Sequence, residues 1–273
     1  MLGEMLESVR KTGPLVHNIT NYVTANDCAN ILLACGASPI MADEEEEAEE
    51  ISALCRATNI NLGTLNRRSI PAMLKAGKAA AALGHPVLLD PVGAGASQLR
   101  TETAGRLLEE IPFSIVRANM SEIRALAQGQ GESRGVDACA EDRVSRENLP
   151  QALDFIRSFA KKIGAVVSVS GEIDIITDGE RAFCVYNGRP EMSAVTGTGC
   201  MLSAMTGAYA GANPGKFLEA AAAAVCAMGV CGELAFARMG PLDGNAGYRN
   251  YIIDAVYNLN AETLERRAKI ELW

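Results

Sequence analysis

The chain has 273 residues, a length that allows about two domains or one large α/β sheet. Hydrophobic residues make up 48% and charged residues 21% of the sequence, which excludes a disordered chain. The net charge of −8 argues against a general DNA or RNA binder, because such a protein needs a basic face to neutralise phosphates. Small anionic ligands are not excluded, since a few local donors can bind them.

Short apolar, β-rich runs alternate with longer, alanine-rich segments along the whole chain. In chain order, strands are expected at 38–41, 59–62, 86–89, 114–116, 165–169, 173–177 and 182–186. Helices are expected at 24–34, 44–57, 69–83, 101–110, 121–128, 149–163, 199–210, 216–237 and 248–268. Buried parallel strands are continuous apolar runs, and crossover helices join them. The alternation therefore predicts an α/β fold, with a mostly parallel sheet flanked by helices on both faces.

Residues 1–273 show no repeat, low-complexity linker or clean domain boundary, so we expect a single domain. Asp178-Gly179 would turn the chain between its last two strands, which predicts an antiparallel hairpin. The polar, glycine-rich segment 129–142 is long enough for a surface excursion. The acidic run 43–50 is typical of a solvated helix face, with Asp43 as the N-cap.

The eight cysteines are scattered and include no Cys-x-x-Cys pair, which argues against a zinc ribbon. The first twelve residues include acidic and basic side chains, so they hold no apolar core of a signal peptide. The apolar stretch 218–231 contains Glu219 and is not expected to span a bilayer. We therefore expect a cytoplasmic protein with reduced thiols and no membrane partner.

The strongest local motif is Val195-Thr196-Gly197-Thr198-Gly199-Cys200, which is followed by a helical segment. Two glycines two positions apart let the backbone curve closely around an anion, and the helix points free N–H groups toward it. Cys200 falls in the first helical turn, where a thiolate is stabilised and the pKa of the thiol is lowered. The alternative is a tight loop that packs a helix, with Cys200 as a small buried hydrophobic residue.

Two further candidates come at the carboxyl ends of predicted strands, where open α/β sheets bind ligands. Asp90 ends the apolar run that starts at Pro86, and the alternative role for its carboxylate is to cap the following loop. Ser170 and Gly171 follow the strand at 165–169, where a hydroxyl and a glycine N–H would hold nucleotide phosphate.

A similar arrangement follows the strand at 114–116. Arg117 would grip a phosphate through its planar fork of donors, and Glu122 would hold the water shell of a Mg²⁺ ion. The alternative is that Asn119 or Ser121 caps a helix, with Glu122 in its first turn. If the strands are parallel, all these side chains share one rim with the glycine turn, which favours phosphoryl transfer.

Over nearly the whole chain, the sequence resembles the hydroxyethylthiazole kinases of the ribokinase-like superfamily. Cys200 is the most specific match, because the wider sugar and vitamin kinases of that superfamily carry Asp there as the catalytic base. The other matching segments are 14–21, 38–41, 61–65, 89–95, 117–122, 170–172 and 196–200. The resemblance implies a ribokinase-like fold without a separate lid domain.

The resemblance also implies a role for each candidate residue. The residues expected at the thiazole alcohol are Met41, Gly197 and Asn18. Arg117 and Ser170 would bind the ATP phosphates, and Asp90 and Glu122 would organise Mg²⁺. The backbone at 197–200 would stabilise the transferring γ-phosphoryl group. The family forms homotrimers with substrate sites between subunits, so Met41 would serve a neighbouring site. Ala118 and Ser170 replace a frequent Gly and a frequent Thr of the family.

These expectations combine into one hypothesis, the ATP- and Mg²⁺-dependent phosphorylation of 4-methyl-5-(2-hydroxyethyl)thiazole in thiamin salvage. Because phosphoryl transfer depends mainly on positioning and charge stabilisation, a weak base such as Cys200 is tolerable. His17 and His85 are expected to be structural, since nothing pairs them with a nucleophile or metal. The alternatives are another ribokinase-like kinase of a small alcohol, which would be expected to carry Asp instead of Cys200, and a non-catalytic thiazole- or nucleotide-binding regulator.

Overall fold

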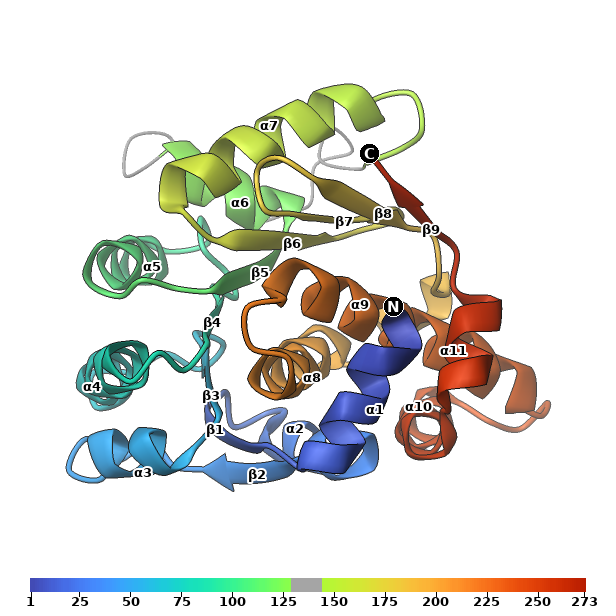
Figure 1. Ribbon diagram of the computed structural model, residues 1–273, viewed down its shortest axis with the longest axis horizontal. Helices are drawn as coiled ribbons and strands as arrows, with labels where there is room; N and C mark the ends of the chain where they lie inside the picture. Colours follow the sequence, from blue (N-terminus) through green and yellow to red (C-terminus); the bar gives the residue numbers. More distant parts are fainter. Residues whose placement is uncertain (129–143) are drawn as a thin grey trace.

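The computed structural model describes residues 1–128 and 144–273, so the surface excursion expected at 129–142 lies outside the described residues. The strands of the described ranges form one sheet in the order β2-β1-β3-β4-β5-β6-β7-β8-β9 (Figure 1). Pairing is parallel from β2 to β6 and antiparallel from β6 to β9. The bounds are β1 (Leu15–Ile19), β2 (Ser38–Met41), β3 (Ala57–Asn61), β4 (Val87–Asp90), β5 (Ile115–Asn119), β6 (Val166–Ser170), β7 (Asp174–Thr177), β8 (Ala182–Val185) and β9 (Ile270–Leu272).

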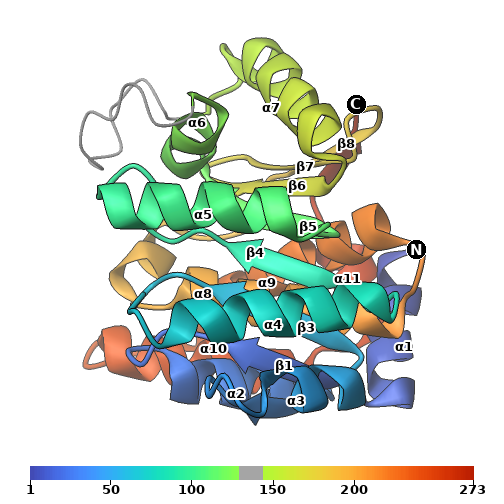
Figure 2. The same ribbon diagram turned by 90° about the vertical axis from the view of Figure 1, so that its left-hand side faces the viewer.

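Helices cover both faces of this sheet, which confirms the predicted layers; Figure 2 shows α4 and α5 lying across one face. That face carries α3 (Ala48–Leu54), α4 (Ser69–Ala82), α5 (Gln98–Glu110), α6 (Met120–Gln128) and α7 (Leu149–Ile163). The other face carries α1 (Leu2–Thr12), α2 (Ala25–Cys35), α8 (Thr198–Ala212), α9 (Phe217–Arg238), α10 (Asn245–Asn258) and α11 (Ala261–Arg267). A short 3₁₀ helix, η2 (Pro190–Ala194), precedes α8.

The sheet separates two hydrophobic cores, because successive strand residues point to opposite faces. Leu88 and Leu89, for example, are both fully buried but belong to different cores. The most apolar 18-residue stretch of the inner helix α9 has a mean hydropathy of 1.8, enough for a membrane span. However, 78% of this stretch is buried inside the fold. It is therefore a core helix, in agreement with the sequence. The cysteines in the described ranges are all free, and Cys139 lies outside those ranges.

Strands β1 and β9 and helix α1 are present in addition to the elements predicted from the sequence. β1 carries His17 and Asn18, whose polar side chains interrupt the apolar pattern although both are buried. β9 has only three residues, too few to show an alternation. The predicted hairpin is present, because β7 pairs antiparallel with β8 and Gly179 turns between them with φ +95°.

Two predicted boundaries are wrong. The helix expected at 248–268 is two helices, because Asn260 accepts a hydrogen bond from the N–H of Thr263 and caps a new helix, α11. Strand β5 continues to Asn119, so Arg117 lies within the strand.

The acidic run does not start a helix where the sequence suggested. Asp43 accepts a hydrogen bond from the Tyr22 hydroxyl at 2.9 Å, and α3 begins only at Ala48, with Glu47 at the N-cap position. The prediction of Asp43 as an N-cap is therefore wrong. The run itself is mostly exposed to solvent, as expected.

Candidate active site

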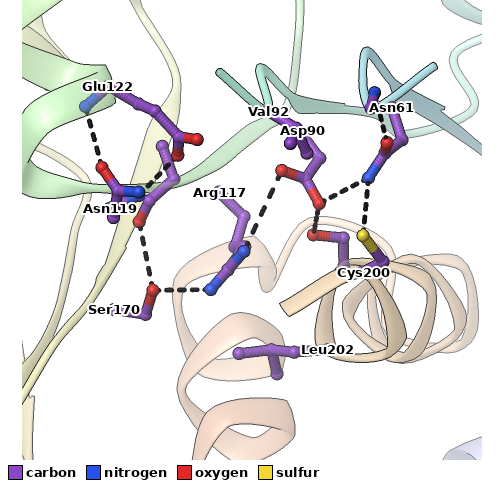
Figure 3. A network of polar contacts seen from close by, with 12 residues as sticks. Asn61, Asp90, Val92, Arg117, Asn119, Glu122, Ser170, Cys200 and Leu202 are labelled. Carbon is purple, nitrogen blue, oxygen red and sulfur yellow. Dashed lines mark hydrogen bonds and ion pairs between the residues drawn. The ribbon is translucent and has the colours of Figure 1, made fainter. Parts of the chain in front are cut away.

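The carboxyl ends of β4, β5 and β6 meet the N-terminus of α8 beside a cavity of about 1110 Å³. Arg117, Ser170 and Gly199 all line this cavity. The sequence-predicted rim is therefore present, since parallel pairing brings these strand ends to one edge. Figure 3 shows the polar contacts that connect them.

Arg117 is held between two strand ends. Its Nη2 donates to Oγ of Ser170 at 2.5 Å, and its Nη1 lies 3.9 Å from Oδ1 of Asp90. A Cβ atom at Gly199 would lie 2.6 Å from Nη1, so only glycine lets α8 approach the guanidinium this closely. The neighbouring Ala118 lies in β5, and no non-glycine residue of the described ranges has a positive φ, so this departure from the family pattern causes no strain.

Asp90 is fully buried at the end of β4. Its Oδ2 accepts hydrogen bonds from Nδ2 of Asn61 at 2.8 Å and from Oγ of Ser203 at 2.7 Å. Burial raises the pKa of Asp90, while the charge of Arg117 opposes that shift. Oδ1 has no hydrogen-bond partner within the described part of the chain and faces Arg117. The carboxylate is thus held by hydrogen bonds at Oδ2, while the buried Oδ1 faces Arg117, and neither oxygen caps the following loop.

Cys200 lies in the first turn of α8, after the N-cap Gly197 with φ +86°. Its Sγ accepts hydrogen bonds from the side-chain amides of Asn21 at 3.1 Å and Asn61 at 3.3 Å. Burial and the charge of Asp90 nevertheless raise the pKa of the thiol. The predicted lowering of this pKa is therefore wrong, because desolvation and a like charge outweigh the amide donors and the helix end.

Glu122 and Asn119 form a reciprocal helix cap at the start of α6. Oδ1 of Asn119 accepts from the N–H of Glu122, and Oε2 of Glu122 accepts from the N–H of Asn119, both at 2.9 Å. Oε1 of Glu122 accepts from the N–H of Gly93 at 2.9 Å. Burial, followed by the charge of Asp90, raises the pKa of Glu122. The capping alternative from the sequence is confirmed. The carboxylate of Glu122 also interacts electrostatically with Asp90.

The backbone N–H of Gly171 does not have the role suggested by the sequence. It donates to Oδ1 of Asp174 at 2.9 Å, so it already has a partner. Burial raises the pKa of Asp174 to about 7. Ser170 alone remains of the pair expected to hold phosphate.

The predicted substrate residues lie apart from this network. Met41 ends the edge strand β2 and is 39% exposed. Asn18 is buried beside it in register, where its amide donates to the carbonyl of Val16 and accepts from Asn59, both at 3.0 Å. Gly197 lies at the N-terminus of α8, where a Cβ atom would lie 2.4 Å from Cγ2 of Thr24.

Both histidines are placed as expected for structural residues. His17 is fully buried between Ser52 and the carbonyl of Ala42, each 2.8 Å from a ring nitrogen. Burial lowers the pKa of His17. His85 is partly buried before β4, away from the strand ends that form the rim.

Three polar residues at the site were given no role from the sequence: Asn21, Asn61 and Ser203. Asn61 is the last residue of β3 and pairs in register with Asp90, the last residue of β4. A polar residue at the end of a buried strand was the signal that identified Asp90, and it applies equally to Asn61. Ser203 follows Cys200 by about one helical turn, so it faces the same side of α8.

Comparisons with known proteins identify the family of the chain. The model of the "Hydroxyethylthiazole kinase family" matches residues 6–262. A hydroxyethylthiazole kinase of Clostridium acetobutylicum is 59% identical over 271 residues, which is 99% of each chain. A hydroxyethylthiazole kinase of Clostridium beijerinckii is 46% identical over 99% of this chain and 96% of the relative.

Solved structures support the same assignment. The hydroxyethylthiazole kinase of Pyrococcus horikoshii OT3 superposes with a TM-score of 0.88 at 36% identity, over 100% of this chain and 98% of that one. A pyridoxal kinase of Staphylococcus aureus superposes with a TM-score of 0.57 at 14% identity, covering 95% and 97% of the chains, and this likeness concerns the ribokinase-like fold alone. Together, the fold, the rim of polar strand ends and these relatives show that the chain is a kinase of the hydroxyethylthiazole kinase family.

Proposed function

We propose that the protein transfers the γ-phosphoryl group of ATP to the primary alcohol of 4-methyl-5-(2-hydroxyethyl)thiazole, as a step of thiamin salvage in the cytoplasm. The observation that carries this proposal is the position of Arg117, Ser170 and the glycine turn on the wall of one cavity. At about 1110 Å³ this cavity is large enough for a nucleotide, since ligand pockets commonly measure about 300–1,000 Å³.

Arg117 and Ser170 would bind the phosphates of ATP. The guanidinium offers a planar fork that matches phosphate oxygens, and Ser170 orients it from the side. The N-cap Gly197 has no side chain to cap the first N–H groups of α8, which lie next to Arg117 through Gly199. These free donors would stabilise charge on the transferring group, since a helix N-terminus binds anions.

A Mg²⁺ ion fits this site when phosphates and water supply most of its ligands. Oδ1 of Asp90 is a buried acceptor without a partner within the described residues, whereas both oxygens of Glu122 accept backbone N–H groups. The described ranges hold no group of three acidic, cysteine or histidine side chains that would form a complete cage. We propose that Asp90 holds the ion and Glu122 holds its water. When bound, the ion would neutralise charge on the phosphoryl oxygens.

Cys200 would have a modest role as a base. Its raised pKa keeps the thiol protonated at neutral pH, and the alcohol loses its proton late in a loose transition state. Only the small thiolate fraction of Cys200 would accept that proton as the new bond forms. The larger contribution would come from the donors that surround the phosphoryl group.

Met41 would contact the thiazole in a site shared with a neighbouring subunit of a homotrimer. Its exposure at the end of the edge strand β2 supports this position, and Gly197 would contribute from its own subunit. Asn18 pairs with Met41 in register, so it would support the strand end next to the substrate.

The test is to incubate purified protein with Mg-ATP and the thiazole alcohol and to detect the phosphate ester by mass spectrometry. We expect ester formation that requires the alcohol and stops on addition of EDTA. ATP hydrolysis without ester, or binding of the thiazole without turnover, would contradict the proposed reaction and favour another acceptor or a binding role. Sedimentation measurements on the same sample test the trimer.

A further inference from the structure

Asn61 connects the two groups at the centre of the site. Its Nδ2 donates to Oδ2 of Asp90 at 2.8 Å and to Sγ of Cys200 at 3.3 Å. The residue is 1% exposed and ends strand β3, directly beside Asp90 in the sheet. Figure 3 shows its amide between the carboxylate and the thiol.

The orientation of this amide is determined by its other contacts. Oδ1 of Asn61 accepts from the N–H of Gly63 at 2.8 Å and from Nδ2 of Asn21 at 3.1 Å. Turning the amide over would place its NH₂ group against these two donors and its oxygen against the carboxylate of Asp90. Only the observed orientation lets both amide hydrogens donate and both lone pairs of Oδ1 accept a hydrogen bond.

We propose that Asn61 is a positioning residue for phosphoryl transfer, because one amide nitrogen holds the carboxylate of Asp90 and the thiol of Cys200 in a constant mutual arrangement. This inference rests on the proposed function, in which Asp90 acts at the phosphates and Cys200 at the acceptor alcohol. It adds a residue that touches neither substrate. The amide sets the relative position of two groups that come from strand β4 and helix α8.

The expected consequence of removing the amide is a loss of turnover with little loss of binding. Ser203 still holds one oxygen of Asp90, and Asn21 still holds the thiol. Asp90 and Cys200 therefore remain in the site, but no side chain connects them and sets the distance between them. Misplacement of reacting groups by about 1 Å costs about 10²-fold in rate.

Asn59 provides a matched control on the same strand. It lies two residues before Asn61, so it points to the same face of β3, and it is fully buried. Its Nδ2 donates to Oδ1 of Asn18 at 3.0 Å. Asn59 has no hydrogen bond to Asp90 or Cys200 within the described residues. Replacing Asn59 by Ser therefore removes a buried amide of the same kind without releasing the two central groups.

The experiment compares wild type, Asn61→Ser and Asn59→Ser by melting temperature and by steady-state kinetics with Mg-ATP and the thiazole alcohol. We expect both variants to melt earlier. Only Asn61→Ser should lose about 10²-fold in kcat, with both KM values within about threefold of wild type. Asn61→Leu keeps the branched shape and the number of side-chain heavy atoms, and it replaces the serine variant if that one does not fold.

Two outcomes would overturn the inference in different ways. If wild type forms the ester and the Asn61 variants lose no more kcat than Asn59→Ser, Asn61 is only a structural residue. If the Asn61 variants lose activity only through a higher KM, Asn61 likewise does not position the reacting groups. If wild type itself forms no ester while it remains folded, the proposed function fails, and this inference fails with it.

Discussion

Nη1 of Arg117 lies 3.9 Å from Oδ1 of Asp90, and both side chains are almost completely buried, with exposed fractions of 11% and 1%. The separation is too long for a hydrogen bond, so the two charges attract each other without using their donors and acceptors on each other. Oδ1 of Asp90 and Nε of Arg117 have no hydrogen-bond partner among the described residues. The pair is thus electrostatically balanced, and in the proposed function its remaining polar atoms would bind phosphate and a cation.

Replacing Arg117 should separate phosphate binding from fold stability. Lysine keeps the positive charge but loses the planar fork, so we expect Arg117→Lys to lower kcat/KM for ATP about 10²–10³-fold. Alanine would also leave Asp90 as a buried unpaired charge, which costs roughly 3–5 kcal/mol. Arg117→Ala should therefore melt well below Arg117→Lys. Arg106→Lys is the control, because Arg106 forms an exposed ion pair with Glu110 and its replacement should change neither ATP kinetics nor melting temperature. Unchanged ATP kinetics in Arg117→Lys would exclude the phosphate role.

Cys200→Ala should keep measurable activity. Because burial and Asp90 raise the pKa of the thiol, little thiolate is present at neutral pH, and we expect kcat to fall by less than about 10²-fold. Wild type and Cys200→Ala should also show the same dependence of kcat on pH between pH 7 and 9. A wild-type rise with pH that disappears in the alanine variant would instead identify the thiolate as the working base. Cys55→Ala, another buried thiol, tests for unspecific loss.

The two glycines of the turn should respond differently to alanine. A Cβ at Gly199 would displace the guanidinium of Arg117, so we expect Gly199→Ala to raise the KM for ATP about tenfold with little change in melting temperature. Gly197 has φ +86° and lies against Thr24, so Gly197→Ala should lose about 1–3 kcal/mol of stability.

Gly105 is the control for both glycine variants. It lies in α5 with nothing within 4 Å of an added Cβ, so Gly105→Ala should gain about 0.5–1 kcal/mol. If Gly199→Ala binds ATP like wild type, the close approach of α8 to Arg117 has no role in binding. The measurements are urea unfolding and initial rates at varied ATP.

His17 should make the protein less stable in mild acid. Nε2 donates to the carbonyl of Ala42, which only accepts, and Nδ1 therefore accepts from the hydroxyl of Ser52. Burial lowers the pKa of the folded ring, so the unfolded chain binds more protons below its own pKa of about 6.5. Stability from the neutral ring is present above that pH and falls as the pH drops below it.

The variant His17→Gln keeps a donor and an acceptor but does not titrate. Between pH 7.5 and 5.5, wild type should lose up to about 1.4 kcal/mol more unfolding free energy than His17→Gln. The comparison cancels titration of groups common to both proteins. Equal losses in the two proteins would show that His17 is not held neutral by the fold.

Much of the architecture could be predicted from local patterns. Apolar strands alternating with helices predict a parallel sheet, and that geometry alone brings Asp90, Arg117 and Ser170 to one edge. The patterns failed where a strand carries buried polar residues, as in β1 with His17 and Asn18. Burial of such polar residues is compensated by hydrogen bonds to segments that are distant in the sequence. A short stretch of sequence does not contain those partners.

The sequence by itself determined the α/β layers, the glycine turn before α8 and the residue types of the polar strand ends at Asp90, Arg117 and Ser170. Those features depend on strand and helix periodicity and on single residues with special backbone freedom. Tertiary structure alone decided the environment of Cys200, whose amide donors Asn21 and Asn61 lie 179 and 139 residues away along the chain. It also decided the direction of the pKa shift of Cys200, because desolvation and the charge of Asp90 act only after distant segments have packed together.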